Sequence, residues 1–214
     1  MNQHTNASID GYTAFKGLLF APGCPKALKT LELYLANYQE TPTLQILIKE
    51  SEDKAETLEY EFNRLCVGPY KIPVPPYESV FVSGRRQLLT DETSDVIDAY
   101  QEVGLMASPT WGEPADYIGT ELEFMSYMES LLLNPKCDGF QKPPAVLRQL
   151  ADDFLTDHLG KWYQEFTQQI IQHSQHPFWA QYAAALCHFL DIQIQIAAER
   201  QQNVNIEESR YELS

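Results

Sequence analysis

The sequence lacks the long apolar runs and paired cysteines that characterise membrane proteins and disulfide-stabilised proteins. No window approaches the roughly 18 consecutive apolar residues of a transmembrane helix. Cys24, Cys66, Cys137 and Cys187 occur without a CxxC pair, which indicates reduced thiols rather than a disulfide framework. The apolar stretch GLLFAPG near the N-terminus is too short for the core of a secretory signal. We therefore expect a soluble, cytoplasmic protein with no membrane insertion.

Positive charge is also scarce in this chain. Fifteen lysines and arginines stand against thirty aspartates and glutamates, which gives a formal net charge of −15 over 214 residues. Such a field repels a phosphate backbone, so we expect no nucleic-acid partner, whereas a basic partner would be attracted. An acidic surface that only keeps the protein in solution is an equally simple explanation.

Recognised catalytic, metal-binding and phosphate-binding motifs are absent from the sequence. The segment GEPADYIG (112–119) lacks the lysine and the preceding strand of a phosphate-binding loop. His173 and His176 have a spacing that two metal ligands on one helix can have, but no third ligand follows nearby. Cys187 and His188 lie in an apolar helical pattern and are expected to pack in the core. We expect neither a metal nor a cofactor.

Apolar side chains recur every three or four residues along most of the chain, which is the spacing of one helix face. Strand-like alternation is nearly absent, and the short stretch SVFVSG (79–84) is expected to form an extended loop. The tail from residue 200 loses the apolar pattern and is expected to fray. The sequence therefore predicts an all-α fold, a single helical bundle. The expected helices carry Leu28, Leu31 and Leu35; Leu58, Phe62 and Leu65; Val96, Tyr100 and Val103; Ile118, Leu122 and Met125; Leu147, Leu150 and Phe154; Trp162, Phe166 and Ile170; and Phe178, Tyr182 and Phe189.

Loops that contain proline interrupt the helical pattern at residues 67–89, 106–116 and 134–144. Proline has no amide N–H and restricts the residue before it, so the centre of a proline-rich segment cannot be helical. We expect an N-terminal helical part over 1–133, a hinge at 134–144 and C-terminal helices over 145–214, all within one globular unit.

The segment 112–133 is expected to be a helix that begins in an acidic loop. Pro114 suits a first helical turn, where its missing N–H would be unpaired in any case. Glu113 and Asp116 then place negative charge beside the positive end of the helix dipole. The reason for the neighbouring Trp111 is not evident from helix formation alone.

Aromatic residues in the first two proline-containing loops favour recognition of a peptide. Tyr70, Tyr77 and Trp111 are expected at the surface, where aromatic rings give a large contact area at a low cost in entropy. Alternatively, the loops only cross the surface of the bundle and Trp111 fills a place in the core. These residues leave both explanations open.

Two motifs in these loops, and a third further on, resemble a known family. The first is EFNRLCVGPYKIPVPPYESVFV (61–82), in which a helix ends at a GP turn before PPYESV. The second, EPADYIGTELEFMSYM (113–128), begins with EPxD, and the third is DHLGKWYQEF (157–166). Together they resemble the TorD/DmsD family of redox-enzyme maturation chaperones over most of residues 55–195. The matching residues are Gly68, Pro69, Pro75, Pro76, Tyr77, Ser79, Val80, Glu113, Pro114, Asp116, His158, Leu159, Trp162 and Phe166.

The resemblance implies an all-helical cytoplasmic chaperone that is not an enzyme. Its clients would be molybdenum-cofactor reductases with a twin-arginine export leader, such as trimethylamine N-oxide or dimethyl sulfoxide reductase. It would bind the leader and the apoprotein until the cofactor is inserted. Glu113 and Asp116 would receive leader arginines, Tyr77 and Trp111 would line the apolar part of the site, and Tyr117 would also bind the peptide.

Other motif residues are expected to shape the loops, which lowers the entropy lost on binding. Tyr117 stands where the family motif has histidine, so a histidine-based pH sensor is not expected here. Guanine-nucleotide binding follows from the resemblance alone, since no phosphate loop supports it. Members occur as monomers or as dimers that exchange helices, and the hinge at 134–144 suits such an exchange. The loop-shaping residues are Gly68, Pro69, Pro75, Pro76, Ser79 and Pro114.

Two other functions remain open at this point. In the first, the protein is a small enzyme in which Glu113 or Asp116 of the acidic loop 113–117 acts as a general base with Tyr117 as its partner. In the second, it is a scaffold domain without an export client.

Overall fold

The computed structural model describes residues 3–51, 54–69, 71–84, 87–106, 113–134 and 142–212. Within these residues the regular elements are all helical, and the single strand-like feature is an isolated antiparallel bridge between Tyr77 and Tyr117. The predicted all-α fold is confirmed. The elements are α1 (Gln3–Phe20), α2 (Pro25–Tyr38), α3 (Pro42–Ser51), α4 (Ala55–Phe62), the π-helix η1 (Asn63–Val67), α5 (Glu78–Val82), α6 (Asp91–Glu102), α7 (Ile118–Leu133), α8 (Pro144–Phe154), the π-helix η2 (Leu155–Leu159), α9 (Gly160–His173) and α10 (Pro177–Glu212).

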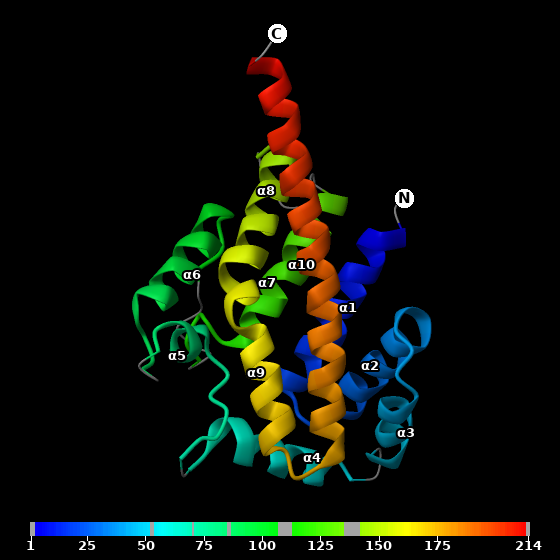
Figure 1. Ribbon diagram of the computed structural model, residues 1–214. Coiled ribbons are helices and arrows are strands. Elements are labelled where there is room, and N and C mark those ends of the chain that lie inside the picture. The colour runs from blue at the N-terminus through cyan, green and yellow to red at the C-terminus, as the bar shows by residue number, and fades with distance from the viewer. Residues whose placement is uncertain are drawn as a thin grey trace.

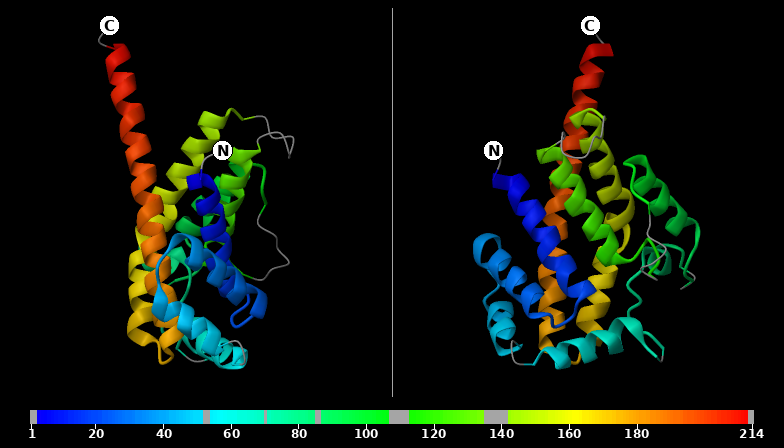
Figure 2. Two further views of the ribbon diagram at one scale, coloured as in Figure 1. Left: turned by 90° about the vertical axis from the view of Figure 1, so that its right-hand side faces the viewer. Right: turned by 180° about the vertical axis from the view of Figure 1, so that it is seen from behind.

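Helices from both ends of the chain pack together in the body of the molecule (Figure 1). The helix α10 packs along α9, and α1 packs along α7, as the view from behind in Figure 2 shows. The helices α2 and α3 lie on one side of this body and α5 and α6 on the other (Figure 1). Because the N-terminal and C-terminal helices share one buried core, the chain forms a single helical domain. No helix of the described ranges combines the length and the apolar character that crossing a bilayer requires.

The helix α1 is central to the core, although the sequence pattern did not predict it. Tyr12 and Phe15 are fully buried, and the hydroxyl of Tyr182 donates a hydrogen bond of 2.7 Å to the carbonyl oxygen of Phe15. Because α1 is contacted by α2, α7 and α10, its buried side chains are not confined to one narrow stripe. A search for an amphipathic stripe therefore overlooks it.

Three predictions of local structure are wrong. The stretch predicted as an extended loop contains α5, whose first amide groups donate to Asp116. The tail continues as α10 to Glu212 and projects beyond the body (Figures 1 and 2). The third error concerns the helix expected over 112–133, since α7 begins only at Ile118 and Pro114 therefore lies in the preceding loop. Hydrogen bonds to the first proline-rich segment hold that loop out of the helix.

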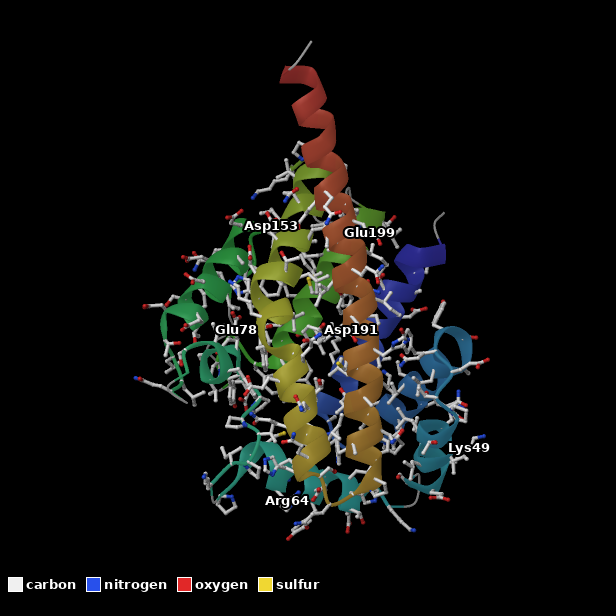
Figure 3. The ribbon with its side chains drawn as sticks, viewed as in Figure 1. Lys49, Arg64, Glu78, Asp153, Asp191 and Glu199 are labelled. Atoms are coloured by element: carbon white, nitrogen blue, oxygen red, sulfur yellow. The ribbon has the colours of Figure 1, made fainter. Side chains whose placement is uncertain are left out.

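At the end of the bundle where α9 connects to α10, Arg64 of η1 holds this connection in place (Figure 3). Its guanidinium group donates to both carboxylate oxygens of Glu61, at 2.7 and 2.8 Å, and to the carbonyl oxygen of His173 at 2.6 Å. The predicted helix end at Gly68 is confirmed: this residue has a φ of 110°, which favours glycine, and follows η1 directly. The hinge predicted at 134–144 falls largely on residues 135–141, outside the described residues, and stays a prediction.

Candidate functional site

The two motif loops pair with each other through their backbones just before α5 and α7. The amide of Ile118 donates to the carbonyl oxygen of Pro76 at 3.0 Å, and the amide of Glu78 donates to that of Asp116 at 3.0 Å. These bonds flank the bridge between Tyr77 and Tyr117. We call this paired region, residues 75–79 with 114–118, the clasp.

Asp116 lies inside the clasp rather than at the surface. It is fully buried, and its Oδ2 atom accepts a hydrogen bond of 2.9 Å from the amide of Ser79, which is also fully buried. A carboxylate bonded to a buried amide fixes the start of α5 against the second motif loop. In this geometry the carboxylate is not exposed to a ligand in solution, and the predicted contact with a leader arginine remains untested.

Tyr117 and Tyr77, whose ring centroids lie 5.9 Å apart, connect the clasp to two other segments. The hydroxyl of Tyr117 donates to the carbonyl oxygen of Leu19 at 2.6 Å, and its ring contacts Phe20, which joins the clasp to the end of α1. The half-buried Tyr77 donates from its hydroxyl to Oε2 of Glu113 at 2.5 Å. Burial, followed by this hydrogen bond, raises the pKa of Tyr77, so its phenol remains a donor at neutral pH. Glu113 is thereby held in place while its side chain stays exposed.

The remaining predicted loop residues differ widely in exposure. Pro76 is buried, Pro75 and Pro114 are half-buried, and Pro69 is exposed. The amide of Tyr77 donates to the carbonyl oxygen of Pro75 at 3.1 Å, which forms the turn before α5. Trp111, predicted to line the site, lies outside the described residues.

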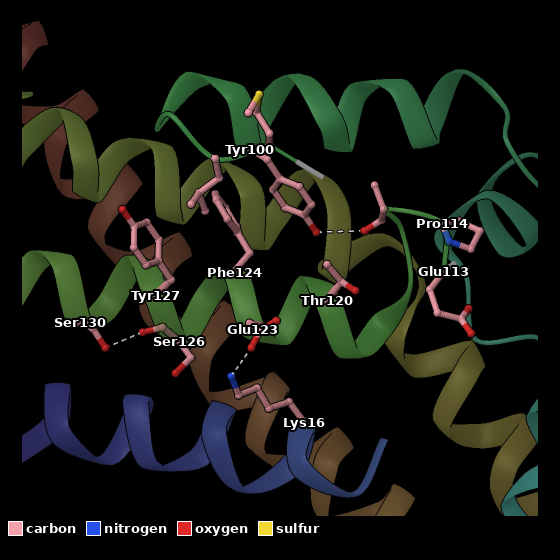
Figure 4. Close-up of a pocket in the computed structure, with 13 residues that line it drawn as sticks. Lys16, Tyr100, Glu113, Pro114, Thr120, Glu123, Phe124, Ser126, Tyr127 and Ser130 are labelled. Atoms are coloured by element: carbon pink, nitrogen blue, oxygen red, sulfur yellow. Dashed lines mark hydrogen bonds and ion pairs between the residues drawn. The ribbon is translucent and has the colours of Figure 1, made fainter. Parts of the chain in front are cut away.

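A cavity of about 560 Å³ lies directly beside the clasp (Figure 4). It is bounded by side chains of α1, α6 and α7 and by the loop 113–115. Glu113 and Pro114 lie at one end and Ser130 at the other (Figure 4). The volume is in the range of about 300–1,000 Å³ that is usual for ligand sites. Its lining residues are Lys16, Tyr100, Leu105, Met106, Glu113, Pro114, Ala115, Thr120, Glu123, Phe124, Ser126, Tyr127 and Ser130.

The chemistry of this cavity is apolar with two carboxylates. Phe124 and Tyr100 contribute aromatic rings that pack 4.7 Å apart between their centroids. The hydroxyl of Tyr100 donates to the carbonyl oxygen of Ala115 at 3.1 Å, so one wall of the cavity is attached to the clasp. Glu113 and Glu123 supply the negative charge. Such a surface is complementary to a ligand with apolar groups and positive charge.

A second group of acidic residues, Glu78 of the clasp and Glu121 of α7, is buried, and sequence reasoning missed it. Glu78 lies on α5 where this helix meets the segment η2–α9 (Figure 3), and its Oε2 is 3.0 Å from Nδ1 of His158. Glu121 is fully buried, and Oε2 of its carboxyl group accepts a hydrogen bond of 3.3 Å from the indole N–H of Trp162. Burial raises the pKa of Glu121, and the charges of Glu78 and Asp116 raise it further.

A signal for Glu121 was present in the sequence. In α7 it follows Ile118 by three residues and precedes Met125 by four, so it lies on the buried face of that helix. No comparable signal identified Lys16 and Glu123, which meet only because α1 and α7 pack together.

The described residues contain no cluster of three or more metal-binding side chains. Nδ1 of His176, one of the two spaced histidines, instead accepts a hydrogen bond of 3.2 Å from the amide of Phe178. The predicted absence of a cofactor stays a prediction, and so does the guanine-nucleotide binding that the family resemblance alone implies.

Comparison with known proteins identifies the family. Residues 17–168 match the family model described as the nitrate reductase delta subunit. The chain belongs to this family. Curated proteins similar to this chain include TorD and DmsD chaperones, which confirms the resemblance carried by the three motifs.

The chain is 27% identical over 124 residues to the Tat proofreading chaperone DmsD of Salmonella typhimurium, a match that covers 58% of this chain and 54% of that relative. The chain thus spans about half the length of this relative. It is 24% identical over 178 residues to the chaperone protein TorD of Aliivibrio salmonicida, which covers 78% of this chain and 81% of the relative.

The same fold occurs in a crystal structure described as a redox enzyme maturation protein from Archaeoglobus fulgidus. The TM-score is 0.56 at 18% identity, and the match covers 89% of this chain and 95% of the other. The two curated relatives are named as chaperones rather than as catalysts, in agreement with the prediction that this chain is not an enzyme.

Proposed function

We propose that the protein is a cytoplasmic chaperone that binds the twin-arginine leader and the apoprotein of a molybdenum-cofactor reductase until the cofactor is inserted. The observation that carries this proposal is the cavity beside the clasp, in which an apolar interior is combined with Glu113 and Glu123. A leader of this kind joins two arginines to an apolar stretch, so its chemistry is complementary to the cavity. The net charge of −15 adds a long-range attraction for a basic segment.

The geometry also suggests how the peptide lies in the site. Glu113 is exposed at one end of the cavity, where Tyr77 holds its carboxylate. The apolar side chains Phe124 and Leu105 line the interior. We place the leader arginines at Glu113 and Glu123 and the apolar stretch along the cavity toward Ser130. Asp116 and Tyr117 support this surface from inside the clasp, without contacting the peptide.

The alternative of a small enzyme, with Glu113 or Asp116 as general base and Tyr117 as its partner, is not favoured, because the hydroxyl of Tyr117 donates to the carbonyl oxygen of Leu19 and Glu113 accepts from Tyr77 instead. A general base must reach the substrate within hydrogen-bond distance. Asp116 is fully buried, and Glu121, whose pKa is raised, is buried as well and does not line the cavity. The scaffold alternative is separated from the chaperone by the peptide experiment below.

The proposal is tested by titrating the full chain with a synthetic peptide that carries two adjacent arginines followed by an apolar stretch. We expect binding, which Glu113→Gln should weaken by up to about fivefold, because an exposed ion pair contributes at most about 1 kcal/mol. The matched control is Glu59→Gln, which removes the same charge from an exposed position on α4 and should leave the affinity unchanged.

A second variant tests the apolar part of the site. Ser130 is exposed at the far end of the cavity, so Ser130→Trp introduces a large ring there without displacing a buried group. We expect at least about tenfold weaker binding at an unchanged melting temperature. A peptide with alanine in place of both arginines should bind more weakly. Equal binding of the two peptides would favour the scaffold alternative, and absence of binding to the wild-type protein would overturn the proposal.

A further inference from the structure

One wall of the cavity carries an ion pair between the helices α1 and α7. The ammonium nitrogen of Lys16 lies 2.7 Å from Oε1 of Glu123, and Figure 4 shows this pair beside the cavity. Lys16 is the one basic side chain among the described residues that line it. The side chains of Lys16 and Glu123 are 21% and 43% exposed, so solvent and ligands can reach both. The pair is thus part of the cavity surface and not of the core.

The two carboxylates of the cavity are therefore held differently. Glu113 accepts a hydrogen bond from the neutral phenol of Tyr77, so its negative charge is uncompensated there. Glu123 is neutralised by Lys16. A positively charged ligand can approach Glu113 directly, but a guanidinium group that pairs with both oxygens of Glu123 must displace Lys16 from Oε1.

The exchange of one cation for another at Glu123 depends on the kind of cation. A partly exposed ion pair is weak, so its loss is tolerated when a stronger pair replaces it. A guanidinium group can donate two parallel hydrogen bonds to a carboxylate, whereas an ammonium group acts as a point charge. An incoming arginine therefore gains by replacing Lys16, and an incoming lysine gains little.

We propose that Lys16 is a specificity-determining residue whose ammonium group occupies Glu123 until an arginine of the bound peptide replaces it. This inference rests on the proposed function, because it assumes that the cavity receives the peptide. In the free protein Lys16 neutralises Glu123, so other cations are attracted less strongly to this carboxylate than to Glu113. In the complex its flexible side chain moves toward solvent, and Glu123 and Glu113 together hold the arginines.

The first test measures affinity. Lys16→Met keeps most of the aliphatic stem and removes the competing charge, so the arginine peptide should bind up to about fivefold more tightly. The control is Lys29→Met, which also removes a lysine from an ion pair, here with Glu32 at 2.6 Å on α2, away from the cavity. A peptide with lysines in place of both arginines should bind the wild-type protein more weakly than the arginine peptide.

The second test follows Lys16 itself. Acylation of lysine amines, read by mass spectrometry of the wild-type protein, should increase at Lys16 when the arginine peptide is bound and stay constant at Lys29. In Glu123→Gln the amine of Lys16 has lost its partner, so its acylation should already be high without peptide and should not increase on binding.

The outcomes separate this inference from the proposed function. If the wild-type protein binds the arginine peptide but Lys16→Met binds it equally or more weakly, the inference fails and the proposed function stands. The same holds if acylation of Lys16 is unchanged or falls on binding, or if the lysine peptide binds as tightly as the arginine peptide. If the wild-type protein does not bind the arginine peptide, both are overturned.

Discussion

The clasp and the cavity lie next to each other, yet they are built in opposite ways. In the clasp Asp116 and Ser79 are fully buried, and the backbone amide of Ser79 donates a hydrogen bond to the carboxylate of Asp116. In the cavity Glu113 is exposed and Lys16 and Glu123 are partly exposed. The difference indicates that Asp116 and Ser79 hold the motif loops together, whereas Glu113 of the second motif and residues of α1 and α7 line the proposed ligand site.

The two regions are connected through a few side chains. Tyr77 belongs to the clasp and holds Glu113 at the cavity, while Tyr100 lines the cavity and bonds to the backbone of Ala115. Loss of the clasp should therefore disturb the cavity. Changes on the cavity wall should leave the clasp intact.

The largest effect on the free energy of unfolding is expected from Asp116→Ala. This change removes the carboxylate that accepts from the amide of Ser79 and leaves that amide buried without a partner. Loss of a hydrogen bond to a charged group typically costs about 1.5–3 kcal/mol of unfolding free energy, which urea denaturation can measure. Glu113→Gln, at the exposed end of the cavity, should change stability by less than about 0.5 kcal/mol. If Asp116→Ala instead binds the peptide more weakly while its free energy of unfolding is unchanged, Asp116 contacts the ligand.

An intermediate effect, dependent on pH, is expected from Glu121→Gln. Because burial raises the pKa of Glu121, the folded protein binds a proton that the unfolded chain releases above a pKa of about 4.3. The contribution of this carboxyl group to stability is therefore greatest below that pH and decreases as the pH rises toward the folded pKa. Glutamine cannot ionise, so the unfolding free energy of Glu121→Gln should fall less between about pH 5 and pH 8 than that of the wild-type protein. Parallel curves for the two proteins would contradict the assignment.

The smallest effect on the free energy of unfolding is expected from Tyr117→Phe. The ring keeps its packing against Phe20, but the hydrogen bond from the hydroxyl to the carbonyl oxygen of Leu19 is lost. A neutral hydrogen bond contributes about 0.5–1.5 kcal/mol, which should appear as a modest decrease in the denaturation midpoint. Tyr60→Phe is the control, since Tyr60 is 73% exposed. If both variants behave alike, the hydroxyl of Tyr117 does not fasten the clasp to α1.

Much of the fold was predictable because helical periodicity is a local property. The helices α2, α6, α8 and α9 were predicted from apolar spacing, and the end at Gly68 was predicted from the residues that follow it. The helix α5 was missed because its first amides are satisfied by Asp116, which lies far away in the sequence. The start of α7 was placed too early for the same reason.

The candidate site was predicted only in part. The motif loops do come together, but Asp116 and Tyr117, expected to contact the peptide, are buried. Nothing local to Asp116 distinguishes a carboxylate that binds a ligand from one that binds a backbone amide. The cavity wall could not be predicted at all, because Lys16 and Glu123 are more than a hundred residues apart in the chain.

The sequence by itself determined that the protein is all-α and acidic, and that its two motif loops resemble those of a chaperone family. These properties follow from residue spacing, composition and short motifs, which require no knowledge of the packed chain. Only the tertiary structure decided which acidic residues are exposed, because burial depends on contacts between distant segments. It placed Asp116 inside, sealed Glu121 beside Trp162, and left Glu113 and Glu123 at a cavity formed where α1, α6 and α7 meet.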